Sequence, residues 1–482
     1  MAKPKRQHPL AVVHAFGSYI LLLALPLLRS LLLLREGWRG WLSGVWQDGL
    51  VLAAILVFGY LRWRMNTYEV LEEGIFFRDG IFFRRSRYIP YYSLTAVVLE
   101  RPFYLRPFPI ARILLETDAG SPKDPDVALL LRQADAKLLM AAAGRELPGE
   151  RLTRAYTPNP WAAAFLSLLT SNSLTGVLFA STLISQTGRL LGKEAEERLL
   201  DSLTRLMQLL AFGLPPAAAA IALILLGGWL LSFALHLVNH LGFKAERRGG
   251  MLTVRAGVLT LRQYQLTVKK INFMQLRQSL LTRLLGYCAV LINCTGYGKG
   301  KNELAVLLPA ANEQELRRGL QMVLPEIRPG RRTCRCLPRT VTRFLIPPLT
   351  LLAALFAAVF LAWRQLPALR TLVFFLGLMG VLPAVWWFFV KLAAFRYVGV
   401  ELKGRTCTFR SVFGYAFYTT VAPADKVTQI ELRRSLFQKM AGCCDMVVRL
   451  RSEKGRRIVV QNVPQTAADS FLTSWAADSA VS

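Results

Sequence analysis

The chain has 482 residues, 53% of them hydrophobic, and its 60 Lys and Arg against 30 Asp and Glu give a net charge of +30. This length predicts two to four domains, and the hydrophobic content excludes a typical soluble protein. A basic chain indicates either nucleic-acid binding or basic loops beside an anionic membrane, and the long apolar runs favour the membrane.

Six apolar runs occur in pairs, and each approaches the roughly 20 residues needed to cross a bilayer core. They cover residues 10–34 and 48–63, 160–184 and 207–241, and 343–363 and 371–395. We therefore predict six transmembrane helices arranged as three hairpins that alternate with three modules. The predicted order is a basic tail and first hairpin in residues 1–65, a module in 66–156, a hairpin in 157–241, a module in 242–332, a hairpin in 333–395 and a module in 396–482.

The basic residues predict the orientation of the hairpins. Of the 60 Lys and Arg, 51 lie on the side of the modules and eight lie in the opposite loops. Cytoplasmic loops carry the excess of basic residues in membrane proteins. We expect a multi-pass protein of the cell membrane, with the modules and both termini in the cytoplasm.

One motif recurs in each module after a predicted strand. The copies are LERPFYLRPFP at 99–109, LRQSLLTRLLG at 276–286 and LRRSLFQKMAG at 432–442. Ser279 and Ser435 are aligned with each other, but the first copy has Pro102 in their place and ends in Pro109 instead of Gly. Each module also contains strands of alternating hydrophobicity and ends in a predicted helix, at 134–144, 312–324 and 467–475.

These motifs, together with the alternation of hairpins and modules, resemble the bacterial membrane-flanked PH-like domain family in its three-module form. The resemblance covers essentially the whole chain. It implies small, strongly bent antiparallel sheets, each closed by a C-terminal helix, so the expected fold class is membrane α + β. It implies no particular activity.

The basic residues of the motif are the candidate contacts for anionic lipid headgroups or for a protein partner. The alternative is that they hold down a loop of their own module. They are Arg101, Arg106, Arg277, Arg283, Arg433, Arg434 and Lys439. A denser basic segment, residues 328–343, is interpreted as an anchor next to the third hairpin.

Polar residues within the apolar runs form a second candidate site. Arg29 lies near the end of the first run, and Ser171 and Asn172 make the third run polar. Such residues line transport paths, although small and hydroxyl residues also allow tight helix packing.

Catalytic patterns are absent from the sequence. It has no P-loop, no G-x-S-x-G, no H-E-x-x-H and no G-x-G-x-x-G after a strand, and its seven cysteines do not form a metal-binding pattern. We predict a protein that is not an enzyme and uses no metal or cofactor. Its modules are expected to bind lipid headgroups, protein partners or copies of itself, but not nucleic acid. The alternative function is transport of a lipid or small amphiphile through the helices.

Overall fold

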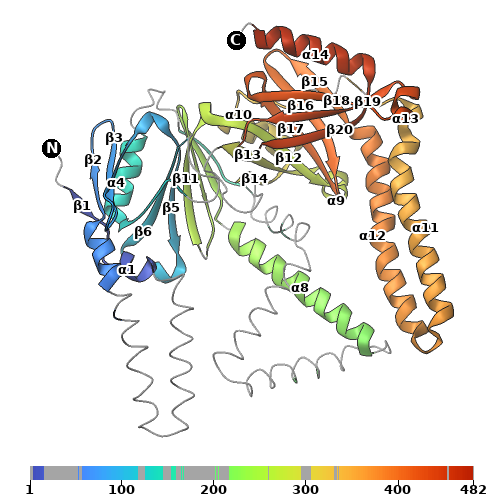
Figure 1. Cartoon of the computed structure of the whole chain (residues 1–482), viewed down its shortest axis with the longest axis horizontal. Helices are drawn as coiled ribbons and strands as arrows, with labels where there is room; N and C mark the ends of the chain where they lie inside the picture. The colour runs from blue at the N-terminus through green and yellow to red at the C-terminus, as the bar shows by residue number, and fades with distance from the viewer. Residues whose placement is uncertain are drawn as a thin grey trace.

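The computed structural model describes ten stretches of the chain and a few isolated positions between them. The stretches are residues 4–15, 57–117, 125–144, 153–158, 216–240, 242–258, 260–294, 305–330, 336–452 and 455–480. Within them, the chain forms antiparallel sheets covered by short helices, and a long helical hairpin projects away from the sheets (Figure 1).

The first sheet has the strand order β1-β2-β3-β4. Its strands are β1 (Lys5–Arg6), β2 (Thr67–Val70), β3 (Gly74–Asp79) and β4 (Arg85–Pro90). Residues two apart in β3, Ile75 and Phe77, face the core, as the two-residue period of a strand requires. Strand β4 pairs with β3 alone and is an edge of this sheet.

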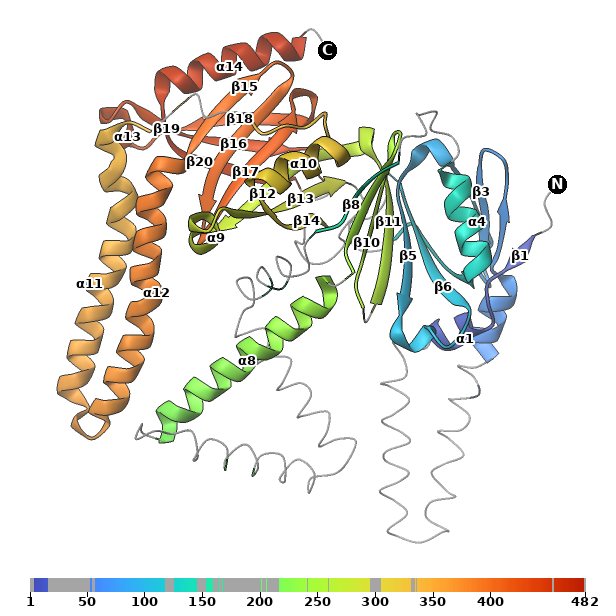
Figure 2. The same cartoon turned by 180° about the vertical axis from the view of Figure 1, so that it is seen from behind.

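The second sheet joins the first two modules, with the order β7-β6-β5-β11-β10-β9-β8. Its strands are β5 (Leu94–Pro102), β6 (Ile110–Thr117), β7 (Val127–Arg132), β8 (Thr153–Tyr156), β9 (Lys244–Arg248), β10 (Met251–Ala256) and β11 (Thr260–Thr267). The junction is the antiparallel pair β5–β11, which runs from Thr260 opposite Pro102 to Leu266 opposite Ala96. β5 and β11 lie side by side in both views (Figures 1 and 2).

The third sheet joins the second and third modules in the same way, with the order β14-β13-β12-β17-β16-β15. Its strands are β12 (Ile271–Ser279), β13 (Tyr287–Cys294), β14 (Ala305–Asn312), β15 (Gly399–Lys403), β16 (Thr406–Phe413) and β17 (Ala416–Pro423). The junction is the pair β12–β17, from Met274 opposite Val421 to Ser279 opposite Ala416. The fourth sheet has the order β18-β19-β20, so β18 and β20 are its end strands. It contains β18 (Val427–Arg433), β19 (Cys443–Leu450) and β20 (Arg456–Pro464).

Helices lie against these sheets at the ends of the modules. They include α1 (Leu10–Ala15), α4 (Gln133–Ala143), α10 (Glu313–Val323) and α14 (Gln465–Ala480), and two five-residue helices, α9 (Leu280–Leu284) and α13 (Leu436–Met440), follow β12 and β18. A capping box at Asn312 and Glu315 begins α10, in which each side chain accepts a hydrogen bond from the backbone amide of the other residue. The helices expected from the sequence at 134–144, 312–324 and 467–475 therefore correspond to α4, α10 and α14, with ends that differ by one residue in α4 and α10.

The hydrophobic core continues across both junctions. Ala96 of β5 and Val421 of β17 pack in the cluster centred on the second module. Phe273 of β12 is fully buried in the cluster of the third module. The sheets are therefore parts of one packed body, because each junction combines backbone pairing with side chains buried on both sides.

The expectation of six transmembrane helices is wrong for the structure described. Among the described residues, two helical stretches are long and apolar enough to cross a membrane, Pro338–Gln365 and Pro367–Tyr397. They contain α11 (Val341–Gln365) and α12 (Arg370–Tyr397). A third helix, α8 (Pro216–His240), contains a shorter apolar stretch, Ile224–Leu235, among the described residues. The first predicted hairpin and the first run of the second lie mostly outside the described residues.

The chain is therefore a mixed α + β protein built from shared antiparallel sheets, and not a six-helix bundle with separate modules. Apolar run length identifies stretches that are hydrophobic enough to cross a bilayer, but it does not show that each forms a continuous helix. In α11 and α12, the apolar run is long enough to cross a bilayer and also forms a continuous helix. Only 11% of the most apolar part of the first helix and 17% of that of the second are buried inside the protein, so these are not core helices of the sheets.

Candidate functional site

Two basic residues of the recurring motif reach the module that follows their own. Arg106, after β5, donates a hydrogen bond to the backbone carbonyl of Val258 in the second module. The guanidinium carbon of Arg283, in α9, lies 4.4 Å from the ring centre of Tyr397 and 5.0 Å from that of Phe417, both close to the third module's sheet. These arginines contribute to the junctions between modules.

The other motif residues lie on the same three segments. Arg433 binds Glu431 at 2.7 Å, and Arg434 donates to Gln465 at 2.6 Å. Lys439 and Arg277 are exposed, whereas the Nε of Arg101 is buried without a hydrogen-bond partner. The seven residues are distributed over the ends of β5, β12 and β18 and do not form one cluster.

The serines of the motif begin the two short helices. The Ser435 hydroxyl accepts a hydrogen bond from the Gln438 amide at 3.3 Å, and the Gln438 side chain accepts one from the Ser435 amide at 2.8 Å. Ser279 makes the same reciprocal pair with Thr282. The glycines that end the motif, Gly286 and Gly442, have φ of +74° and +64°, where a residue without Cβ is favoured.

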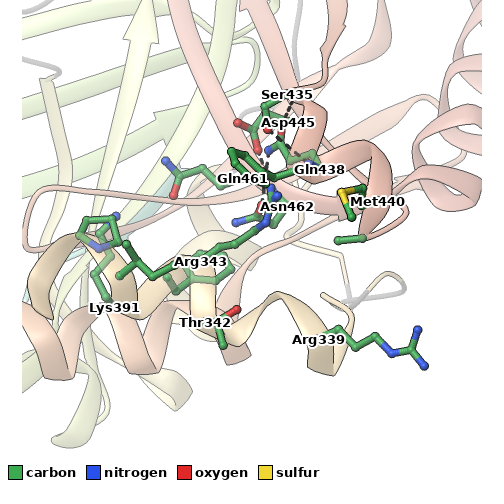
Figure 3. A pocket seen from close by; sticks show the side chains of 15 residues that line it. Arg339, Thr342, Arg343, Lys391, Ser435, Gln438, Met440, Asp445, Gln461 and Asn462 are labelled. Atoms are coloured by element: carbon green, nitrogen blue, oxygen red, sulfur yellow. Dashed lines mark hydrogen bonds between the residues drawn. The ribbon is translucent and has the colours of Figure 1, made fainter. Parts of the chain in front are cut away.

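A cavity of about 690 Å³ lies between the helical hairpin and the third module (Figure 3). Its polar lining comes from the start of α11, the end of α12, the motif helix α13 and the β19–β20 pair. The lining includes Arg339, Thr342, Arg343, Lys391, Ser435, Gln438, Asp445, Gln461 and Asn462, with apolar Phe344, Ile346, Pro347, Phe437 and Met440. We call it the hairpin pocket.

Three cations line the hairpin pocket. No acidic side chain among the described residues lies within ion-pair distance of Arg339, Arg343 or Lys391. The one carboxylate in the lining, Asp445, accepts a hydrogen bond from the backbone amide of Asn462 at 2.8 Å. The pocket therefore has an excess of positive charge that the described protein groups do not neutralise.

The side chains of the pocket are held by local contacts. Gln438 donates to the Asn462 Oδ1 at 3.4 Å, which links α13 to β20. Asn462 has φ of +53°, a left-handed conformation that Asn tolerates better than most residues. Burial raises the pKa of the neighbouring Cys443 thiol, while the positive charge of Arg343 acts in the opposite direction. Figure 3 shows Arg343 beneath Asn462, with Lys391 to one side.

The position of the cations along the helices matches a bilayer surface. At 1.5 Å per residue, Arg343 lies about 33 Å along α11 from Gln365, and Lys391 lies about 32 Å along α12 from Arg370. A hydrocarbon core is about 30 Å thick. If the loop between the helices lies at one surface, both cations lie at the level of the headgroups on the other.

The sequence did not identify the hairpin pocket. Arg339 and Arg343 belong to the dense basic segment interpreted as an anchor, and Lys391 was assigned to an apolar run. The sequence feature that could have indicated the pocket is that both apolar runs of the third hairpin have a basic residue, Arg343 or Lys391, near the end that adjoins the sheets. The second candidate site, formed by Arg29, Ser171 and Asn172, lies outside the described residues. Within the described part of the chain, no group of three His, Cys, Asp or Glu could hold a metal ion.

The profile of the bacterial PH domain family matches residues 20–144 and 204–322, about half of the chain. The chain belongs to the bacterial PH domain family. This confirms the resemblance drawn from the recurring motif. The chain is also similar to the UPF0699 transmembrane protein YdbT of Bacillus subtilis (strain 168), with 22% identity over 366 residues, which are 70% of this chain and 73% of the relative. No solved structure matches the chain significantly.

These relationships, with the helical hairpin, support a membrane-associated PH-like protein. Neither the family description nor the name of the relative includes an enzymatic activity.

Proposed function

We propose that this protein is a membrane-anchored, non-enzymatic binding protein whose hairpin pocket holds the phosphate group of an anionic lipid. The observation that supports it most is the set of three cations, Arg339, Arg343 and Lys391, which have no ion-pair partner among the described residues and lie at the sheet-side end of the hairpin. Cations at this depth interact with anionic headgroups with about 1 kcal/mol each.

The remaining lining of the hairpin pocket fits the two parts of a lipid. Ser435 and Thr342 bring hydroxyl groups that can donate to phosphate oxygens, as in other phosphate sites. Phe437 and Met440 are 75% and 88% exposed at the rim. Exposed apolar side chains beside a bilayer are favourable if they contact acyl chains. Arg434 flanks the same helix and remains a candidate contact for neighbouring headgroups.

The proposed orientation places the hairpin pocket and the sheets on the cytoplasmic side. It is supported by the excess of basic residues on the side of the modules. The cytoplasmic leaflet also carries the anionic lipids that the pocket would bind.

The proposal is tested by native mass spectrometry of the full chain released from nanodiscs of mixed phosphatidylglycerol and phosphatidylcholine. We expect Arg343→Gln to lower the retention of phosphatidylglycerol about fivefold, since it removes about 1 kcal/mol of attraction. The triple Gln variant of Arg339, Arg343 and Lys391 should lose the preference for phosphatidylglycerol.

The matched control neutralises the cations at the other end of the same helices. Arg364→Gln and Arg370→Gln each remove one positive charge, as Arg343→Gln does, but lie far from the hairpin pocket. They should leave the preference unchanged. Equal loss in both sets of variants, or no preference in the wild type, would show that the pocket is not a lipid site.

A further inference from the structure

Among the described strands, β18 and β4 each have one unpaired edge, although the strands at the equivalent positions of the other modules are paired on both sides. At each internal junction, the strand before the motif of one module pairs with the third strand of the next module. The junctions are β5 with β11 and β12 with β17. Among the described strands, β18 pairs with β19 alone and β4 pairs with β3 alone, so neither has a partner of this kind.

The two internal junctions share one register. Leu99 lies opposite Gln263 at the first junction, and Leu276 lies opposite Thr419 at the second. Leu99 and Leu276 are aligned by the recurring motif. Gln263 and Thr419 are also equivalent, because each lies four residues before the end of its strand. The register is therefore a property of the repeated unit, and it can be extended to the unpaired edges.

Both unpaired edges are accessible. The first six residues of β5 and of β12 are all buried, whereas β18 has one buried residue, Val427. In β4 the first four residues are exposed. Exposed strand edges with free backbone groups are templates for pairing with another chain.

We propose that β18 of one molecule pairs antiparallel with β4 of a second copy of this chain, in the register of the internal junctions. That register places Leu432 opposite Ser86 and Glu431 opposite Arg87. Each copy would offer one edge and receive the other, so the contact is head-to-tail and builds rings or open rows of membrane-anchored molecules. This assembly goes beyond lipid binding and does not depend on it.

The charges across the proposed pair set its strength. Glu431 opposite Arg87 is a favourable cross-strand pair, although within one chain Glu431 already pairs with Arg433 and Arg87 with Asp79. Arg433 falls opposite Arg85, and like charges in this position repel. We therefore expect a weak association that is strengthened by Arg85→Glu, which places an acid opposite Arg433. Arg85→Gln should have an intermediate effect.

The motif helices support the same arrangement. Arg106 and Arg283 each reach across the internal junction that adjoins their motif. The aligned residue of the third motif, Lys439, is exposed. A second copy joined at β18 would supply the surface that Lys439 lacks.

The experiment is disulfide crosslinking of the full chain in membranes. Opposed residues of neighbouring strands have Cβ atoms about 5 Å apart, so a chain carrying both Ser86→Cys and Leu432→Cys should form a ladder of dimers and larger species on mild oxidation. Each single variant, the wild type and the off-register pair Ser86→Cys with Ile430→Cys should form it at most one-tenth as efficiently. The internal pair Leu99→Cys with Gln263→Cys serves as the oxidation control, because it should form a bond within one chain.

A single set of outcomes decides the proposal. Monomer alone from the 86/432 pair, when the internal 99/263 pair is oxidised, would overturn it, as would a bond to a protein other than this chain. Arg87→Glu and Glu431→Arg should each reduce the ladder severalfold, and together they should restore it. Arg343→Gln should leave it unchanged, so that failure of lipid binding and failure of assembly are separate results.

Discussion

At the scale of single residues, the turn that ends the motif depends on the absence of a side chain. Gly442 has φ of +64°, and a Cβ built on it would contact no atom within 4 Å. The cost of a side chain here is therefore conformational and not steric. A left-handed backbone costs a residue with Cβ about 1–2 kcal/mol.

We therefore expect Gly442→Ala to destabilise the protein by about 1 kcal/mol, and Gly442→Asn by less, because Asn tolerates the left-handed region. Thermal unfolding of the detergent-solubilised chain measures both. An alanine variant as stable as the wild type would show that the turn can adopt another conformation. The same sequence position is Pro109 in the first module, which has no such turn.

The helix cap and the turn of the motif could be predicted from its residue types. A serine followed by a short helix and a glycine is a recognisable cap sequence, and the structure contains it at Ser279 and Ser435. The places that the arginines reach were not predictable. Arg283 contacts Tyr397 and Phe417, more than 100 residues further along the chain, and only the folded junction brings them together.

At the scale of elements, the junction between β12 and β17 contains a buried polar contact. Gln275 is 2% exposed and donates from Nε2 to the Thr420 hydroxyl at 2.9 Å, and Thr420 is fully buried. A buried hydrogen bond contributes about 1 kcal/mol, and the loss of one partner leaves the other unsatisfied. The energetic coupling between these two side chains therefore reports whether β12 and β17 are paired.

We expect Gln275→Ala and Thr420→Val to be coupled by about 1 kcal/mol in a double-mutant cycle of unfolding free energies. Gln278 is the matched control, since its side chain donates to the Tyr287 carbonyl within the same module. Gln278→Ala and Thr420→Val should be additive. Additivity of the first pair would show that the two strands are not joined as described.

Strands and closing helices were predictable from hydrophobic period, but the pairing of modules was not. Strand β11 carries Arg262, Gln263 and Gln265, and its side chains indicate an exposed edge. Its backbone is nevertheless paired on both sides, with β10 and β5. Side-chain hydrophobicity reports which face of a strand is buried, whereas the hydrogen bonds of an edge lie in the backbone and leave little trace in the sequence.

At the scale of the whole molecule, membrane association was predictable and the number of crossings was not. The third hairpin has two continuous apolar helices, as its sequence predicts. In α8 the apolar stretch found among the described residues, Ile224–Leu235, is shorter than a bilayer crossing needs. The hairpin pocket was also missed, because it forms where residues of one hairpin meet α13, almost 100 residues after the start of α11.

The central claim is that the hairpin pocket is where this protein contacts anionic lipid. The most direct measurement is photo-crosslinking of the full chain in membranes with a phosphatidylglycerol that carries the reactive group on its headgroup, followed by mapping of the labelled peptides. We predict labels within residues 339–347 and 435–441, with the signal lost in the triple Gln variant of Arg339, Arg343 and Lys391. Labels distributed along α11 and α12, with none on α13, would contradict the claim.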